Sequence, residues 1–330
     1  MTLQQPSPRY INPEKREQLR DDGNFIGGLL IMFLILITFL MTAIAITLRL
    51  CGVLSSANLA LPDLGVGNTV YLLFYSGVYT VILGIPCVLG VLLFKRSCHT
   101  LLPTPKPDFH GKGAVFLIGM AACMQGNLRA SSVAAILEGI GFPPPENPQM
   151  LEPNMLSLAL NLLALAVLPA ILEELLFRGC IMGALRPYGD RFAILVSAVL
   201  FGIGHGGLTQ STFAFVAGLT LGWITVASGS IKLAMLIHFG NNAFSTLLEF
   251  IALYLPEKGQ SILNAVSIYA LLIIGFILLI RATRRRDPLM SPIGENTVHG
   301  GEAAKTLCKT PLMVIAVILL LLRVVQNTFL

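Results

Sequence analysis

The feature that most constrains this 330-residue chain is a series of apolar runs, each about twenty residues long, that recur along almost its whole length. A run of that length can cross a hydrocarbon core of roughly 30 Å as a helix. Because lipid cannot hydrogen-bond the backbone, a crossing run must be helical. The composition agrees, since 55% of the residues are hydrophobic and only 12% are charged. The sequence therefore predicts an all-α fold, a polytopic transmembrane helical bundle.

Eight spans are predicted, and each is an apolar stretch bounded by polar or turn-forming residues. They lie at residues 25–49, 69–95, 114–140, 155–186, 191–208, 211–229, 232–254 and 260–281. A further stretch at 311–330 has a shorter apolar run, 312–322, that is followed by Arg323. We expect that stretch to lie in the membrane interface, with a ninth span as the alternative. The predicted domains are an N-terminal tail (1–24), a membrane-embedded domain (25–281) and a basic tail with a C-terminal hydrophobic segment (282–330).

Lys and Arg residues in the short loops indicate the orientation in the membrane, because cytoplasmic loops are enriched in them. Their alternation along the chain predicts a multi-pass cell-membrane protein with a cytoplasmic N-terminus, and with 96–113 and 282–309 also cytoplasmic. The net charge of +5 is largely this topology signal. The arginines at 284–286 fit a juxtamembrane anchor on anionic lipid better than a nucleic-acid site. Membrane lipids are therefore predicted partners, and nucleic acid is not.

Ionisable residues inside spans are the most informative, because burying a charge there is costly unless something compensates it. The fourth predicted span contains Glu173, Glu174 and Arg178. Glu174 and Arg178 are four residues apart, so they share a helix face and can pair. Glu173 lies about 100° around the helix and stays available for general-base chemistry. The structural alternative is a Glu–Arg pair that holds helices together while Glu173 only reaches water.

Two later spans add a second polar group. His205 follows a glycine-rich stretch in the fifth span, and His238 and Asn242 occupy one face of the seventh. Counted inward from the cytoplasmic span ends at about 1.5 Å per residue, these groups and Glu173 lie at depths of roughly 9 to 21 Å. They can therefore converge on one cavity, although helix–helix hydrogen bonds would explain each histidine separately. The nearby glycines, among them Gly202 and Gly240, would let the helices approach closely.

In chain order these residues form three motifs: Glu173-Glu174 with Arg178, Phe201 with His205, and His238 with Asn242. This arrangement, within residues 155–250, resembles the CPBP family of intramembrane endopeptidases, which includes enzymes that process CAAX proteins. The resemblance implies that Glu173 activates a water that His205 helps to hold. His238 and Asn242 would then stabilise the oxyanion, with Glu174 and Arg178 as supporting groups.

The resemblance also implies a metal-dependent alternative, because the family has been described in that way. Glu173, His205 and His238 are acceptable Zn²⁺ ligands by type. The chain contains no HExxH motif, so a metal-free glutamate mechanism is the favoured hypothesis and zinc the alternative.

The predicted function is hydrolysis of peptide bonds in membrane-associated or lipidated peptides and proteins by a glutamate-activated water. One alternative is a non-catalytic scaffold or bacteriocin-immunity protein that keeps the fold for partner binding. A transporter is the other, since buried Glu, Arg and His also serve as proton relays. The polar groups cluster on neighbouring spans and no inverted repeat is apparent, which disfavours transport.

Overall fold

A computed structural model describes residues 11–50, 68–93, 111–144, 151–285 and 300–330. Within these ranges the chain is almost entirely helical and has no β-strand, so the prediction of an all-α polytopic bundle is confirmed. Most of the predicted cytoplasmic stretches 96–113 and 282–309 lie outside the described residues, and the orientation in the membrane stays a prediction.

The helices run in chain order as α1 (Pro13–Leu50), α2 (Asn68–Leu93), α4 (Lys112–Gly139), α5 (Met155–Asn161), α6 (Leu168–Glu174), α7 (Gly183–Leu185), α8 (Asp190–Gly204), α9 (Leu208–Ser228), α10 (Ile231–Ala252), α11 (Glu257–Arg284), α12 (Gly300–Leu307) and α13 (Pro311–Phe329). Residues Met155–Tyr188 form one continuous helical rod. Within it, two π-helical segments, η2 (Leu162–Val167) and η3 (Leu175–Met182), link α5, α6 and α7, and a 3-10 turn, η4 (Arg186–Tyr188), follows α7.

Among the described residues, six helical stretches are long and apolar enough to cross a membrane, against the eight spans predicted. They contain α1, α2, the Met155–Tyr188 rod, α9, α11 and α13. Helix α8 is only 15 residues long, below the roughly 20 that a span requires. Helix α4, the predicted span 114–140, and helix α10 are long enough at 28 and 22 residues, but interior polar residues lower the hydropathy of both. In α10 the same polar residues that mark the site therefore weaken the signal for a span.

Helix α13 qualifies as a span by length and composition, whereas the sequence favoured an interfacial position for it. It packs along α1, and the two backbones come so close that a Cβ added to Gly27 would overlap the carbonyl carbon of Leu312. Helix α12 also packs on α1. The structure thus adds residues 300–329 to the bundle, beyond the predicted boundary at 281, and α1 begins inside the predicted N-terminal tail.

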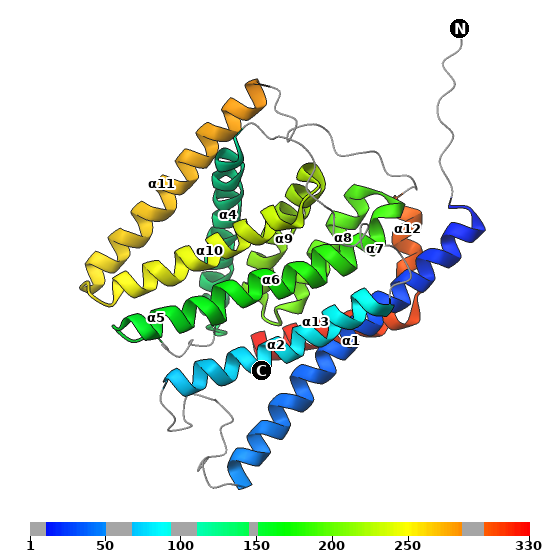
Figure 1. The fold of residues 1–330 in the computed structure, drawn as a ribbon, viewed down its shortest axis with the longest axis horizontal. Coiled ribbons are helices and arrows are strands. Elements are labelled where there is room, and N and C mark those ends of the chain that lie inside the picture. Colours follow the sequence, from blue (N-terminus) through cyan, green and yellow to red (C-terminus); the bar gives the residue numbers. More distant parts are fainter. Residues whose placement is uncertain (1–10, 51–67, 94–110, 145–150, 286–299) are drawn as a thin grey trace.

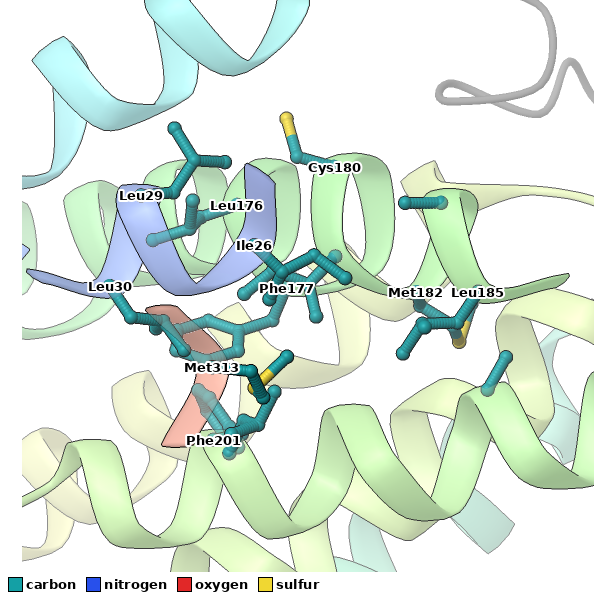
Figure 2. Packing of buried hydrophobic residues seen from close by; sticks show 14 of the residues in the cluster. Ile26, Leu29, Leu30, Leu176, Phe177, Cys180, Met182, Leu185, Phe201 and Met313 are labelled. Carbon is teal, nitrogen blue, oxygen red and sulfur yellow. The ribbon is translucent and has the colours of Figure 1, made fainter. Parts of the chain in front are cut away.

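The helices are arranged in three groups. Helices α1, α2, α12 and α13 gather on one side, α4 and α11 lie on the other, and α6, α8, α9 and α10 fill the space between them (Figure 1). A continuous apolar core joins the first group to the centre. Figure 2 shows Leu30 of α1 and Met313 of α13 beside Phe177 of η3 and Phe201 of α8, and all four side chains are buried. This packing fixes the central rod against the flanking helices.

Candidate active site

The central rod changes its hydrogen-bond pattern just before the two glutamates. Pro169 has no backbone N–H, so it cannot donate an α-helical hydrogen bond to the carbonyl of Leu165 four residues earlier. In a membrane such a freed carbonyl must find another partner. The side-chain amide of Asn242 on α10 supplies it, donating from Nδ2 to the Leu165 oxygen over 2.9 Å. The proline therefore creates a binding point that joins α10 to the rod.

Glu174 is the centre of a buried ion cluster. Its Oε1 accepts from Arg178 Nη1 at 2.8 Å and lies 2.9 Å from His238 Nδ1. Arg178 also donates to the Gly218 carbonyl of α9 at 3.4 Å and stacks its guanidinium over the Phe201 ring. Because the Glu174 side chain is fully shielded from solvent (0% exposed), it can hold other groups in place but cannot meet a substrate.

Glu173 faces a different environment one residue earlier. Its Oε1 accepts a hydrogen bond from the Tyr79 hydroxyl of α2 at 2.5 Å. Its Oε2 is buried with no hydrogen-bond partner, yet His205 Nε2 lies 4.0 Å and His238 Nε2 3.8 Å from it. Its side chain keeps 14% of its surface accessible. The structure thus contains one buried carboxylate oxygen that is directed at two imidazoles and bonded to neither.

The partners of the two imidazoles define their tautomers. His205 Nδ1 lies 2.8 Å from the carbonyl oxygen of Phe201, which can only accept, so Nδ1 carries the proton. His238 Nδ1 faces the carboxylate of Glu174, with the same consequence. In both neutral rings the Nε2 atom that faces Glu173 is therefore an acceptor. Each becomes a donor there only when its ring is protonated.

A tight turn places His205 at the end of α8. The helix ends at Gly204, and Gly206 adopts a left-handed conformation (φ 78°) that favours glycine. Close helix packing supports the turn, because a Cβ at Gly202 would lie 3.1 Å from the side chain of Phe215 on α9. A Cβ at Gly240 of α10 would likewise lie 2.6 Å from the Phe116 ring. The expectation that these glycines allow close approach therefore agrees with the packing at these two positions.

A cavity of about 620 Å³ contains the predicted reactive groups. Its polar lining includes Glu173, His205, His238 and Asn242, so the structure places all four predicted catalytic residues around one space. Glu174 and Arg178 lie behind this lining, in the supporting position predicted for them. Most of the wall is apolar and comes from several helices, with Phe33 and Ile37 of α1, Ile82 and Leu83 of α2, and Leu221 of α9.

Among the polar residues of this cavity that sequence reasoning missed are Tyr79, Asn241 and Arg323. Each had a signal. Tyr79 lies well inside α2, whereas tyrosine in membrane helices is enriched at the interfaces. Asn241 adjoins Asn242, and its amide donates to the Asn242 Oδ1 at 3.1 Å, which fixes the orientation of that amide. Arg323 was used only to mark the end of an apolar run, although an ionisable residue inside a membrane helix is itself a candidate functional group.

The donor atoms are of the right type for zinc, but their spacing is too wide. Ligand atoms around a tetrahedral Zn²⁺ stand about 3.4 Å apart, as follows from bond lengths of about 2.1 Å. The Glu173 Oε2 atom is 3.8 and 4.0 Å from the two Nε2 atoms. Across the described part of the chain, no group of three or more His, Cys, Asp or Glu residues is arranged to hold a metal ion. This spacing therefore favours a reaction carried out by the chain's own residues.

Comparison with known proteins supports the class that the fold and site indicate. Residues 155–244 match the family model described as "Type II CAAX prenyl endopeptidase Rce1-like". The chain is 28% identical over 181 residues to "Putative membrane peptidase YdiL" of Bacillus subtilis (strain 168), covering 54% of this chain and 74% of that protein. No solved structure matches the chain. The resemblance to the CPBP family is thus confirmed, and the comparisons support a membrane peptidase.

Proposed function

We propose that this protein is an intramembrane endopeptidase in which Glu173 activates a water to hydrolyse peptide bonds of membrane-associated or lipidated substrates. The observation that carries the proposal is the unpartnered Glu173 Oε2, buried at the cavity wall within 4.0 Å of two imidazole Nε2 atoms. A buried polar atom normally has a partner, so an exception calls for an explanation. A reacting water supplies one.

The spacing suits such a water. Glu173 Oε2 lies 3.8 to 4.0 Å from the two histidine Nε2 atoms. A water oxygen placed about 2.8 Å from Oε2 and from one Nε2 would form hydrogen bonds to both, and the angle between these bonds at the water oxygen would be about 90°. The water would donate one hydrogen bond to Glu173 Oε2 and a second to the acceptor Nε2 of His205. As the water oxygen attacks the substrate carbonyl carbon, Glu173 takes the first proton. Tyr79, which donates to Oε1, holds the carboxylate plane during this step.

The tetrahedral intermediate needs hydrogen-bond donors for its oxyanion. Asn242 uses one N–H of its amide on the Leu165 carbonyl, and the second N–H is left for the oxyanion. His238 donates to the oxyanion from Nε2 only in protein whose ring already carries a second proton from solvent, and that proton stays on the ring throughout, with Nδ1 held by the Glu174 carboxylate. Collapse of the intermediate breaks the C–N bond. The proton held by Glu173 then passes to the leaving amine, which balances the hydrolysis.

The apolar wall supports membrane-associated substrates. Apart from two tyrosines, the residues of α1 and α2 that line the cavity are apolar. A lipid chain or an apolar peptide segment would therefore lie against them. The polar groups gather at one part of this wall, where they would meet the scissile bond. A lipidated peptide combines both requirements, with an apolar anchor beside a polar peptide group.

The decisive experiment compares two conservative glutamate substitutions in protein purified into phosphatidylcholine vesicles. Cleavage of a panel of acylated and prenylated peptides would be measured by mass spectrometry. Glu173→Gln should lower turnover by about 10²–10⁴-fold, the usual contribution of a positioned general base. The matched control, Glu249→Gln, changes a carboxylate of α10 that lines a separate cavity and should cleave normally. Full activity in Glu173→Gln would refute the assignment, and a wild-type protein that cleaves nothing would favour the scaffold alternative.

A further inference from the structure

Helix α13 brings a cation into the wall of the same cavity. Arg323 follows the long apolar run of α13, and its partly buried side chain lines the cavity together with His205 and Glu173. The segment lies outside residues 155–244, which carry the family match. The arginine is therefore a feature of the flanking helices and is not part of the matched motifs.

Two hydrogen bonds fix α13 on the turn that carries His205. Arg323 Nη1 donates to the carbonyl of Gly204 at 3.1 Å, and the Leu208 N–H that begins α9 donates to Thr328 Oγ1 at 2.9 Å. The turn also leaves space for the guanidinium, because a Cβ at Gly206 would lie 2.9 Å from Arg323 Cζ. The guanidinium is thus held at a defined place, adjacent to the histidine turn.

The charge of Arg323 has no counter-ion in the part of the chain that the structure describes, since no carboxylate there lies within 4.0 Å of it. Its bond to Gly204 uses one of the five N–H donors of a guanidinium. An uncompensated cation in a membrane helix is costly, and such residues usually pair with another group or face a site. Arg178, the other arginine near the cavity, differs because Glu174 neutralises it.

We propose that Arg323 is a substrate-binding residue that takes a carboxylate of the peptide beside His205. This inference rests on the proposed peptidase function and names a recognition element for it. The planar guanidinium binds carboxylates through two parallel hydrogen bonds, and the apolar surroundings strengthen that pairing. The bound carboxylate belongs either to the C-terminus of the peptide or to an acidic side chain, and the two sources share the same chemistry.

Other roles of Arg323, as a helix cap or as a lipid-binding residue, predict different experimental results. A cap on the last carbonyls of α8 needs only one or two N–H donors, which a neutral amide could also supply. A lipid phosphate would pair with the arginine independently of the substrate. Only a substrate subsite makes the effect of the arginine depend on whether the peptide carries a carboxylate.

The test uses full-length protein in phosphatidylcholine vesicles and one acylated peptide that the wild type cleaves. The peptide is prepared with a free C-terminus, with an amidated C-terminus, and amidated with one added Asp. Arg323→Gln should raise KM at least about tenfold for the carboxylate form that the wild type prefers, with kcat changed less than about twofold. Arg323→Lys should recover part of the loss. Gln326→Ala, on an exposed position of α13 away from this cavity, should match the wild type.

The preferred form among the three peptides identifies the source of the carboxylate. Equal KM changes for peptides with and without a carboxylate would overturn the proposal, as would an effect that appears only when anionic lipid is added. A loss of thermal stability with unchanged KM would assign Arg323 to the α8 cap instead. Binding of the same fluorescent peptides to the Glu173→Gln protein supplies a readout without turnover. If no peptide is cleaved, the peptidase proposal fails. Weaker binding of the carboxylate form to the Glu173→Gln, Arg323→Gln double variant than to the Glu173→Gln protein would still support the subsite.

Discussion

The segment that carries the three motifs and the helices that flank it contribute to the cavity in different ways. The rod Met155–Tyr188, α8 and α10 supply Glu173, the two histidines and Asn242, which hydrogen bonds within this segment hold in place. Helices α1 and α2 supply apolar side chains and two tyrosines to the wall, and α13 supplies Arg323. Under the proposed mechanism, the chemistry depends on the motif segment, whereas substrate recognition depends largely on the flanking helices. Substitutions in the two regions should therefore fail in different ways.

The largest expected effect is on stability, within the motif segment. Glu174→Ala removes the partner of Arg178 and leaves a guanidinium buried without a counter-ion. Breaking a buried ion pair in this way costs about 3–5 kcal/mol in soluble proteins. Thermal unfolding in detergent measures the loss, and the neighbouring Glu173→Gln variant is the matched control, expected to unfold like the wild type. If Glu174→Ala unfolded normally, the ion cluster would not be the structural centre of the site.

The next effect is on turnover. Asn242→Ala should lower kcat by about 10²–10³-fold, as loss of an oxyanion donor does in acyl-transfer sites. Because the Leu165 carbonyl also loses its donor, the unfolding midpoint should be recorded for the same sample. The control is Asn127→Ala, an amide that lines a different cavity beside Glu249. A drop in stability that accounts for all of the lost activity would make Asn242 a structural residue only.

A smaller effect is expected from the flanking helices. Tyr79→Phe removes the single hydroxyl of α2 that bonds Glu173, and should reduce kcat on the order of tenfold, since hydrogen bonds to charged groups contribute moderately. Tyr269→Phe, on the exposed surface of α11, should have no effect. Should Tyr79→Phe abolish activity as fully as Glu173→Gln, the hydroxyl would itself take part in the reaction, and the division between the two regions would not hold.

The smallest expected effect concerns metal. Chelation by EDTA should leave the cleavage rate unchanged, and added Zn²⁺ should not raise it, because Glu173, His205 and His238 are spaced for a water. A known zinc peptidase in the same vesicles shows that the chelator works. Activity that is lost on chelation and restored by Zn²⁺ would mean that these side chains move together around a metal, and the water mechanism would have to be replaced.

The motif residues could be found from sequence because helix periodicity carries most of their geometry. A spacing of four residues predicts the contact between Glu174 and Arg178, and the place of Glu173 on another face follows from the same periodicity. The number of helices apolar enough to cross was harder to predict. Polar groups in α10 and the shortness of α8 separate buried helices from spans, and a helix inside a bundle need not be fully apolar.

Contacts between distant segments could not be predicted. Tyr79 is 94 residues from Glu173, and nothing in either local pattern pairs them. Arg323 illustrates a different difficulty, because in the sequence its charge indicates only the end of an apolar run. A charge at the end of an apolar run normally reaches toward water, but this guanidinium turns inward to the Gly204 carbonyl because α13 packs against the bundle. Tertiary packing decided the direction of that side chain, and sequence spacing does not contain it.

The proline of the central rod has a consequence for how the protein can change over generations. Pro169 frees the carbonyl that anchors Asn242, so the two positions are linked although they lie on different helices. An alanine there would add a backbone N–H donor, so that the asparagine amide would share the carbonyl oxygen with it instead of being its side-chain substitute for the missing donor. A substitution at Pro169 that restores regular helical hydrogen bonding would therefore change the hydrogen bonding of Asn242 on another helix. Such a pair should be inherited together, and a lineage that lost one member would be under pressure to lose or re-anchor the other.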